Sequence, residues 1–240
     1  CIRDRAWWVP DEYQIHTPSY LQALAAACRG RGVEILDDHS VVDVDDRDRS
    51  ASVTVQPRQG PIRLIDAESA VVCGGVWSGR FGKRLRLNRS LVPVRGQILL
   101  LKSEQRMLRS VINCGHRYLV PRDDGCVLVG SSEEEVGIQH GTTPVVLNDL
   151  RAFARRLCPA LAMAQERAAW SGLRPLTFDA FPICGKLPGS ESIYVASGHF
   201  RSGIHLSPAT AVCMADLMSG RQPPVDITPF GVGKQQQHVE

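Results

Sequence analysis

The part of this sequence best suited to chemistry is a loop, residues 197–206, in which Arg201 lies between Gly198 and Gly203. An apolar run before the loop predicts a buried strand, and an amphipathic run after it predicts a helix. The glycines allow backbone conformations that other residues avoid, and a helix start carries free N–H groups and partial positive charge. With a guanidinium added, these features are typical of a carboxylate or other anion site. The alternative is an ordinary strand–loop–helix junction with a solvated arginine.

The elements on either side of this loop must position it. A strand is expected over residues 193–196 and a helix over residues 206–218. Ser207 suits the helix N-cap and Pro208 its first position, because an earlier start would cost the helix a hydrogen bond at the proline. The segment after Pro229 is rich in glycine and glutamine, and we expect it to be disordered.

The first part of the chain predicts a helix, a meander of short strands and a buried strand. Thr17 and Pro18 suit a helix start. The apolar face of this helix is expected to consist of Leu21, Leu24, Ala25 and Cys28. Strands are expected over residues 33–36, 41–44, 51–56, 62–65 and 70–73.

From about Leu91 the pattern changes to one typical of an antiparallel sheet. Strands are expected over residues 92–101, 111–113, 117–121, 126–130 and 167–174, and a helix over residues 145–157. The run Asp123-Asp124-Gly125 predicts a hairpin turn. Because the last strand and helix return to the α/β style, we infer a mainly antiparallel domain inserted into an α/β domain. The first and last segments then belong together.

Composition excludes some classes of protein. The 240 residues suit one large or two small domains. A net charge of +3 without a basic stripe argues against a nucleic-acid partner, and no apolar run has the length of a membrane helix. None of the eight cysteines forms a C-x-x-C pair. We therefore expect no metal site, and isolated thiols in a reducing, cytoplasmic compartment.

Five blocks of sequence are informative through their order and spacing. They are residues 9–16 (VPDEYQIH), 72–78 (VCGGVWS), 93–97 (PVRGQ), 116–122 (HRYLVPR) with 128–131 (LVGS), and 170–175 (WSGLRP) leading to 198–203 (GHFRSG). Together they resemble the D-amino-acid oxidase-like family of FAD-dependent amine oxidases, and within it the glycine oxidases of thiamine biosynthesis. The resemblance covers residues 5–220 or so.

The resemblance implies a fold of the α+β or α/β class. A partial FAD-binding Rossmann-like domain would comprise residues 1–85 and 180–225, with an inserted, mainly antiparallel substrate-binding domain over residues 86–179 and a tail at 226–240. Family members begin with a strand, a G-x-G-x-x-G turn and a helix that hold the FAD pyrophosphate. No G-x-G-x-x-G occurs in this sequence. We therefore expect a family member without its N-terminal third, and FAD binding by this chain is left open.

The resemblance also implies roles in substrate binding. Arg174 would pair with the substrate carboxylate, and Tyr118 would hydrogen-bond to it. A bidentate arginine supplies charge and direction, which an amino acid needs if its α-hydrogen is to face the flavin. Arg201 would face the flavin edge and the substrate. His116 lies two residues before Tyr118, so a strand would place both on one face. The alternatives are a structural ion pair for Arg174, a half-buried strand tyrosine and a structural histidine.

For the cofactor, the resemblance implies one group of residues. It consists of Val41 at the adenine, Gly74 and Gly75 near the phosphates, and Gly198, His199, Arg201, Ser202, Gly203 and Ile204 around the isoalloxazine ring. Backbone N–H groups at the helix start would stabilise negative charge on reduced flavin. Ser202 stands where relatives often have asparagine, and Glu133 stands where glycine oxidases carry an apolar residue. A carboxylate at Glu133 would repel the substrate carboxylate or attract its amine.

The leading hypothesis is therefore FAD-dependent oxidative deamination of a small amino acid or amine. A hydride would pass from the substrate α-carbon to flavin N5, with oxygen as the acceptor. The expected partner is a small molecule, with neither nucleic acid nor membrane, and homo-oligomer formation is left open. The alternatives are a non-catalytic fragment unable to hold FAD, and the flavin module of an RNA-modifying enzyme.

Overall fold

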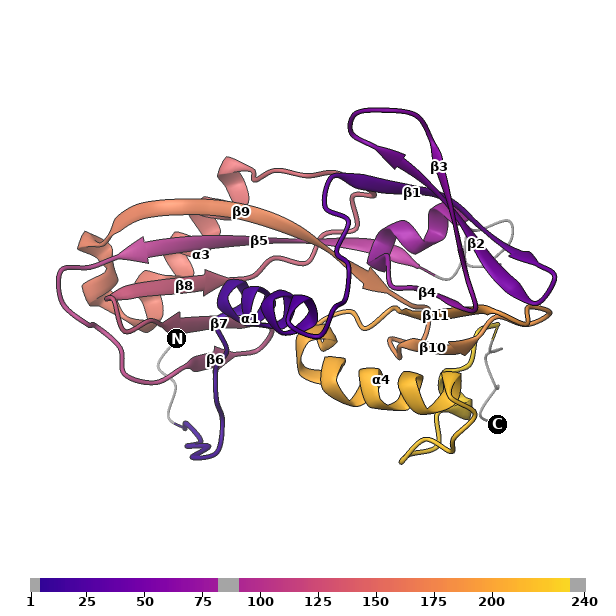
Figure 1. Ribbon diagram of the computed structural model, residues 1–240. Helices are drawn as coiled ribbons and strands as arrows, with labels where there is room; N and C mark the ends of the chain where they lie inside the picture. Colours follow the sequence, from indigo (N-terminus) through magenta and orange to yellow (C-terminus); the bar gives the residue numbers. More distant parts are fainter. Residues whose placement is uncertain (1–4, 82–90, 234–240) are drawn as a thin grey trace.

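The computed structural model describes residues 5–81 and 91–233, and the expected domain boundary between residues 85 and 86 lies outside them. Three β-sheets are formed within the described residues, one of five strands and two of three (Figure 1). No helix in this part of the chain is long and apolar enough to cross a membrane.

The five-stranded sheet has the order β6-β7-β8-β5-β9, and every neighbouring pair is antiparallel. Its strands are β5 (Val92–Lys102), β6 (Ile112–Cys114), β7 (Arg117–Pro121), β8 (Cys126–Gly130) and β9 (Gln165–Leu176). Helix α3 (Pro144–Leu157) and the short 3-10 helix η2 (Pro159–Met163) follow β8. Leu150 and Phe153 of α3 share a buried cluster with Leu99, Leu119 and Val129. One face of the sheet is therefore closed by α3.

The β7–β8 hairpin forms where the sequence predicts it, for local reasons. Arg122 and Cys126 close the turn through a 2.7 Å hydrogen bond from the Arg122 N–H to the Cys126 carbonyl. Gly125 takes a positive φ of 81°, which glycine adopts without strain. The Asp124 carboxylate accepts a hydrogen bond from the Cys126 N–H. This turn brings Tyr118 opposite Gly130 in the ladder.

Two smaller sheets are built from the chain before and after the five-stranded sheet. The first is the antiparallel meander of β1 (His39–Arg47), β2 (Ser50–Pro57) and β3 (Arg63–Ala67). The second has the order β10-β11-β4, formed by β10 (Ile183–Lys186), β11 (Ile193–Ser197) and β4 (Ala70–Val72). Because β11 pairs in parallel with β4, the expected return of the chain to its first part is confirmed.

The β10-β11-β4 sheet has apolar contacts on both of its faces. On one side Val72 and Val195 belong to a cluster that includes Val44 of β1. On the other side Tyr194 belongs to a cluster with Met214 of helix α4 (Gly203–Met218). The meander and α4 thus enclose this sheet, as expected for part of a layered α/β fold.

Helix α4 begins earlier than the sequence predicted. Its N-cap is Ser202, and Pro208 lies inside the helix rather than at its first position. The proline has no N–H to give to the carbonyl of Ile204, four residues earlier. The Ser207 hydroxyl donates a hydrogen bond to that carbonyl instead, at 2.9 Å. The loss expected from an internal proline is therefore partly made good by the residue beside it.

The first helix forms over the predicted residues, but its N-cap is His16 rather than Thr17, and its apolar face is not buried. Helix α1 (Thr17–Arg29) ends at Gly30, and none of its residues is buried. Leu21 and Leu24 are 54% and 44% exposed. The strand expected over residues 33–36 is wrong, since those residues have no regular secondary structure. A strand is stable only when another strand pairs with it, and the described residues provide no partner here.

Two features near the C-terminus also differ from expectation. The sequence analysis did not find β10, whose Gly185 weakens the strand pattern. After the short 3-10 helix η3 (Thr228–Phe230), Val232 is buried in the cluster of Val72 and Val195. The disorder expected after Pro229 is therefore wrong for residues 230–233. An apolar side chain holds this segment against the core.

Candidate functional site

The two faces of the five-stranded sheet carry different side chains. Side chains alternate along a strand, and Leu99 and Leu119 point to the face that α3 covers. Their neighbours therefore point to the opposite face, where Tyr118 lies opposite Gly130 in the ladder. Arg174 of β9 is on this same face, because its guanidinium lies against Gly96 of β5. The charged candidates thus gather on the face of the sheet away from α3.

Arg174 lies flat on a strand that has glycine where a side chain would interfere. A Cβ added at Gly96 would overlap the guanidinium. Arg174 donates to the Ser131 hydroxyl at 2.7 Å and to the Ser132 carbonyl at 3.2 Å. Burial lowers the pKa of Arg174, and Arg201 acts the same way, while Tyr118 and Glu133 favour the cation. An arginine remains protonated under these conditions, and its fork keeps further donors for a ligand.

Tyr118 is also positioned by a glycine on the neighbouring strand. A Cβ added at Gly130 would overlap its ring, so the ring packs flat against the β8 backbone. Tyr118 is half-buried, and it interacts electrostatically with Arg174. The structure therefore brings the two predicted carboxylate-binding residues together from two different strands.

Arg201 reaches the same place from the loop between β11 and α4. One nitrogen lies 2.8 Å from the Glu133 carboxylate, and another donates to the His116 carbonyl at 2.7 Å. His116 lies in the turn before β7 rather than in the strand, and it is exposed. The alternation argument that placed its ring beside Tyr118 is therefore wrong. The contact of His116 with Arg201 is made by its backbone carbonyl and not by its ring.

The segment that carries Ser131, Ser132 and Glu133 is held by a buried polar network. Glu134 pairs with Arg95 of β5 through both backbone and side chain, and the shorter N–O distance of the side-chain ion pair is 2.8 Å. Gln97, which is fully buried, donates to Glu134 and also receives the N–H of Thr143 at the start of α3. The side chains of Arg95, Gln97 and Glu134 are thus hydrogen-bonded to one another or to the segment, which gives the segment a defined position.

The charge of Glu134 is stabilised by these contacts. Burial alone would raise the pKa of Glu134, but hydrogen bonds from Arg95, Ser132 and Gln97, with the charge of Arg95, hold it below the usual 4.5. Glu134 is therefore ionised at neutral pH. Its neighbour Glu133 is left to face Arg201.

The glycines predicted near the cofactor phosphates lie beside the loop before α4. The Gly75 carbonyl accepts a hydrogen bond from the Ser197 hydroxyl at 3.1 Å. A Cβ added at Gly74 would be 3.2 Å from the backbone nitrogen of Ser78 in the 3-10 helix η1 (Gly75–Phe81). Gly198 has a φ of 77°. These turns follow the parallel strands β4 and β11, and ligands bind at such strand ends in α/β folds.

The residues expected around an isoalloxazine ring divide into two groups. Ser202, Gly203 and Ile204 begin α4, and no side chain caps the first N–H groups of this helix. His199 instead turns inward, where its ring lies 2.9 Å from the Thr210 hydroxyl and burial lowers its pKa. The ring of His199 is therefore a structural group, although its backbone remains beside Phe200 in the loop.

Val41 lies on a different sheet from the strands that lead to the other cofactor candidates. It is on β1, next to an irregularity in the pairing with β2, and its side chain is 47% exposed. Further along β1, Val44 enters the cluster with Val195, and Asp46 accepts hydrogen bonds from Ser192 at the start of β11. The chain direction of β1 is therefore opposite to that of β11. Val41 lies towards the C-terminal end of β11, which Gly198 follows.

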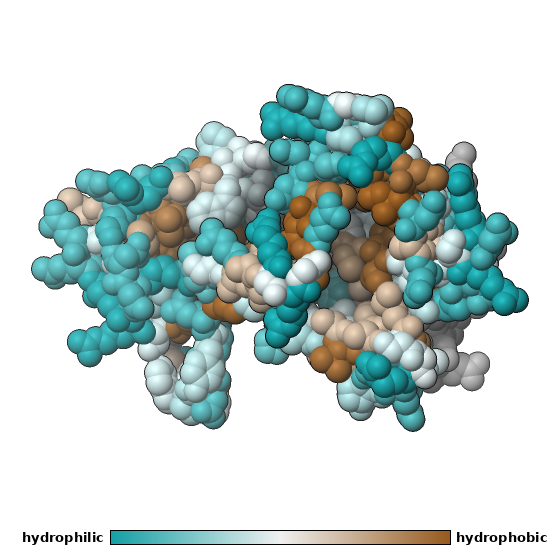
Figure 2. All heavy atoms as spheres, viewed as in Figure 1, coloured by the Kyte–Doolittle hydropathy of each residue, from teal (hydrophilic) through white to brown (hydrophobic). Residues whose placement is uncertain are grey.

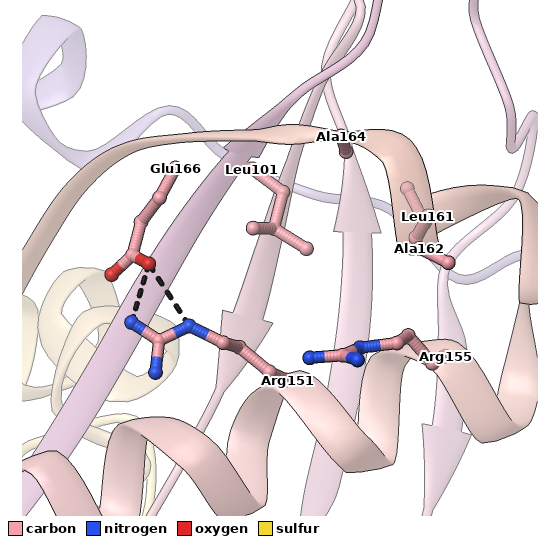
Figure 3. Close-up of a pocket in the computed structure, with 7 residues that line it drawn as sticks. All are labelled: Leu101, Arg151, Arg155, Leu161, Ala162, Ala164 and Glu166. Carbon is pink, nitrogen blue, oxygen red and sulfur yellow. Dashed lines mark hydrogen bonds and ion pairs between the residues drawn. The ribbon is translucent and has the colours of Figure 1, made fainter.

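A small cavity of about 60 Å³ lies elsewhere, on the α3 side of the sheet (Figure 3). Arg151 of α3 points towards it and donates to Glu166 of β9 at 2.9 Å. Leu101, which lines it, belongs to the core face. This cavity is therefore separated by the sheet from Arg174. The described residues also contain no group of three or more side chains suited to a metal ion.

Sequence reasoning missed several residues of this arrangement. Ser131, Gly96 and Gly130 lie inside blocks that the sequence analysis singled out, but no role was assigned to them. A glycine within a strand indicates the close approach of another group, and this signal was present at Gly96. The partner of Glu134 could not be read from the sequence, since it lies 39 residues away at Arg95.

Arg174 and Tyr118 on one face of the five-stranded sheet, with Arg201 from the loop before α4, form a candidate carboxylate-binding site beside an α/β layer. The comparisons with known proteins give the family. Residues 2–217 match the model of the FAD dependent oxidoreductases, and the chain belongs to this family, whose members use FAD. The predicted resemblance and the partial FAD-binding α/β fold are thereby confirmed.

Three relatives show the extent of the similarity. A glycine oxidase of Pseudomonas aeruginosa is 38% identical over 184 residues, which cover 77% of this chain and 50% of that protein. A glycine oxidase of Pseudomonas putida is 32% identical over 216 residues, or 90% of this chain and 58% of the relative. The crystal structure of glycine oxidase from Geobacillus kaustophilus superposes with a TM-score of 0.87 at 27% identity, covering 93% of this chain and 60% of that one. The chain thus spans 50–60% of the length of these relatives.

Proposed function

We propose that this chain supplies the substrate site and the flavin-facing loop of an enzyme that oxidises a small amino acid. The observation that carries the proposal is the meeting of Arg174 from β9 with Arg201 from the loop before α4, beside Tyr118. Two cations and a phenol on one sheet face suit a carboxylate. The relatives named glycine oxidase support a small amino acid as the substrate.

In this proposal the chain binds and orients the substrate. Arg174 would hold the carboxylate in a bidentate pair, and Tyr118 would donate a hydrogen bond to the same group. The α-carbon would then be directed towards the loop at Gly198 and the start of α4. The guanidinium of Arg174 and the ring of Tyr118 are already held in place, because they pack flat against Gly96 and Gly130. Little reorganisation is needed when the substrate binds.

The residues present suit part of an FAD site. The N–H groups at the start of α4, which no side chain caps, suit the negative charge of a reduced flavin, and the turn at Gly74 and Gly75 allows a phosphate to approach the backbone. When bound, FAD would accept a hydride at N5 from the substrate α-carbon and pass the electrons to oxygen. We assign residues 1–85 and 180–225 to this cofactor side and residues 86–179 to the substrate side.

A second reading is favoured by exposed apolar surface on the cofactor side. Space-filling views show apolar side chains around a hollow between the segment that follows α1, β4 and α4 (Figure 2). Val33, Val41 and Leu21 are all exposed. In this reading the chain is a non-catalytic fragment that cannot hold FAD, and such surfaces would favour a homo-oligomer.

The setting of the protein is also part of the proposal. The cysteines within the described residues form no disulfide with one another, which supports the expected cytoplasmic location. The net charge of +3 supports a small-molecule partner rather than nucleic acid.

Two measurements test the proposed function. Purified chain incubated with FAD and desalted should retain flavin absorbance at about 450 nm, a property of the cofactor. A colourless protein would support the fragment reading.

Arg174→Lys should weaken carboxylate binding by about 1.5–3 kcal/mol, because the bidentate clamp is lost. The control is Arg155→Lys on α3, an exposed arginine on the other face of the sheet. Equal carboxylate binding by both variants would remove Arg174 from the site.

A further inference from the structure

The candidate site carries a negative charge beside its two arginines. Arg201 and Arg174 would together present two positive charges, but Glu133 lies 2.8 Å from Arg201. Both Glu133 and Arg201 also interact electrostatically with Arg174. The three groups therefore share one location, and their summed charge is +1.

The Glu133–Arg201 pair is held in place from both sides. The side chains of Arg201 and Glu133 are 32% and 34% exposed, so the pair is partly shielded from water. A second nitrogen of Arg201 donates to the His116 carbonyl, which fixes the direction of the guanidinium. The backbone of Glu134 is bonded in both directions to Arg95, which fixes the segment that carries Glu133. The ion pair therefore does not depend on two mobile surface side chains.

We propose that Glu133 is a specificity-determining residue that restricts this site to ligands with a single carboxylate. The inference rests on the proposed function, since it takes Arg174 as the carboxylate clamp. A monocarboxylate at Arg174 would leave the Glu133–Arg201 pair intact and bring the local charge to zero. A dicarboxylate would bring its second negative charge next to Glu133, and it would have to displace Glu133 from Arg201.

Removal of the Glu133 charge should therefore open Arg201 to a second carboxylate. The probes are acetate and malonate, which differ by one carboxylate and cannot be oxidised as amines, so binding is measured without turnover. Ligand-observed NMR titrations would give both dissociation constants for the full chain. Glu133→Gln should raise the affinity for malonate relative to acetate by about tenfold, the size of coupling seen between neighbouring charged groups.

Matched variants separate a local effect from a change in net charge. Glu135→Gln removes the same charge two residues away from an exposed position, and the malonate-to-acetate ratio should stay at its wild-type value. Glu133→Asp keeps the charge and should keep the preference for acetate. The double variant with Glu133→Gln and Arg201→Gln should lose the gained malonate affinity, because the group that receives the second carboxylate is absent.

The outcomes distinguish this inference from the proposed function. If Arg174→Lys weakens acetate binding but Glu133→Gln leaves the ratio unchanged in a folded protein, the role of Glu133 is overturned and the carboxylate site stands. If Arg174→Lys changes neither ligand, or the wild type binds neither, both ideas are overturned for this chain. If Glu133→Gln unfolds the protein by circular dichroism, Glu133→Asp decides: a shift towards malonate contradicts the inference.

Discussion

Helices α1 and α3 have similar lengths and both carry apolar faces, but only α3 is packed. Leu150 of α3 is fully buried against the five-stranded sheet, whereas Leu21 of α1 is 54% exposed. The sheet beneath α3 is complete in itself. The β10-β11-β4 sheet has only three strands, and within the described residues β4 pairs with β11 alone. The described residues therefore bury α3 against the five-stranded sheet, whereas α1 contributes no buried residue to either the large or the small sheets.

This difference agrees with the coverage of the relatives. The chain spans 50–60% of their length, and what the relatives have in addition would lie in the uncovered part. Parallel strands such as β4 and β11 are normally buried on both faces and flanked by further strands. Among the described residues, β4 is an edge strand and α1 buries none of its side chains. Stability should accordingly be concentrated in the five-stranded sheet.

The largest expected effect tests whether that sheet carries the stability. Leu150→Ala should lower the free energy of unfolding by about 3–5 kcal/mol, because it leaves a cavity in a fully buried cluster. Urea unfolding followed by circular dichroism would measure it. A loss below about 1 kcal/mol, well under the core range, would show that α3 and the sheet are not one packed unit.

The next effect concerns the polar network under the candidate site. Glu134→Gln leaves the buried Arg95 without its counter-charge, and we expect a loss of about 2–3 kcal/mol, reduced from the fully buried case because Glu134 is partly exposed. The same urea experiment applies. Loss of stability without any change in acetate binding would mean that the network does not position Ser131 and Arg174.

The corresponding acid beside the β10-β11-β4 sheet is Asp46 of β1. Its carboxylate accepts hydrogen bonds from Ser190 and Ser192. Asp46→Asn should lower the free energy of unfolding by about 1 kcal/mol, because the same hydrogen bonds would be accepted by a neutral amide oxygen instead of a carboxylate. Hydrogen exchange should show the loss in β1 and β11. A loss as large as that of Glu134→Gln would remove the contrast between the two regions.

The same two acids predict the response to pH. Burial would raise the pKa of Asp46 and of Glu134, but their hydrogen bonds hold both below the usual 3.8 and 4.5. A lowered folded pKa contributes stability that is fully present above the unfolded pKa and is lost as pH falls through the folded value. Stability should be flat above about pH 5 and fall below about pH 4. In Asp46→Asn and Glu134→Gln this fall should be shallower.

The smallest effect is expected in α1. Leu21→Ala should change the free energy of unfolding by no more than about 0.5 kcal/mol, as at other exposed positions. This variant is informative when it is compared with Leu150→Ala, which makes the same substitution in a helix of similar length. A loss above about 1 kcal/mol would lie outside that range for exposed positions and show that the apolar face of α1 is covered in solution, for example by a second copy.

Local sequence determined the elements whose hydrogen bonds close over short distances. The β7–β8 hairpin has the predicted bounds because its Asp-Asp-Gly turn is formed by adjacent residues. Helix α1 begins at Thr17 and ends at Gly30 for the same reason. The family and the arginine-bearing loop could also be inferred from blocks of sequence. The glycines of these blocks mark backbone conformations that other residues avoid, and the arginine between them marks a site for an anion.

Only the tertiary structure decided which of these elements are packed and which side chains meet. Residues 33–36 look like a strand, but no strand of the described residues pairs with them. Helix α4 extends back past Pro208, where the Ser207 hydroxyl takes the place of the missing backbone donor. The sequence placed Glu133 and Arg201 sixty-eight positions apart; the fold brings them within 2.8 Å. Such contacts depend on how the loop before α4 packs against the five-stranded sheet, because side chains distant in sequence meet only when the elements that carry them are packed together.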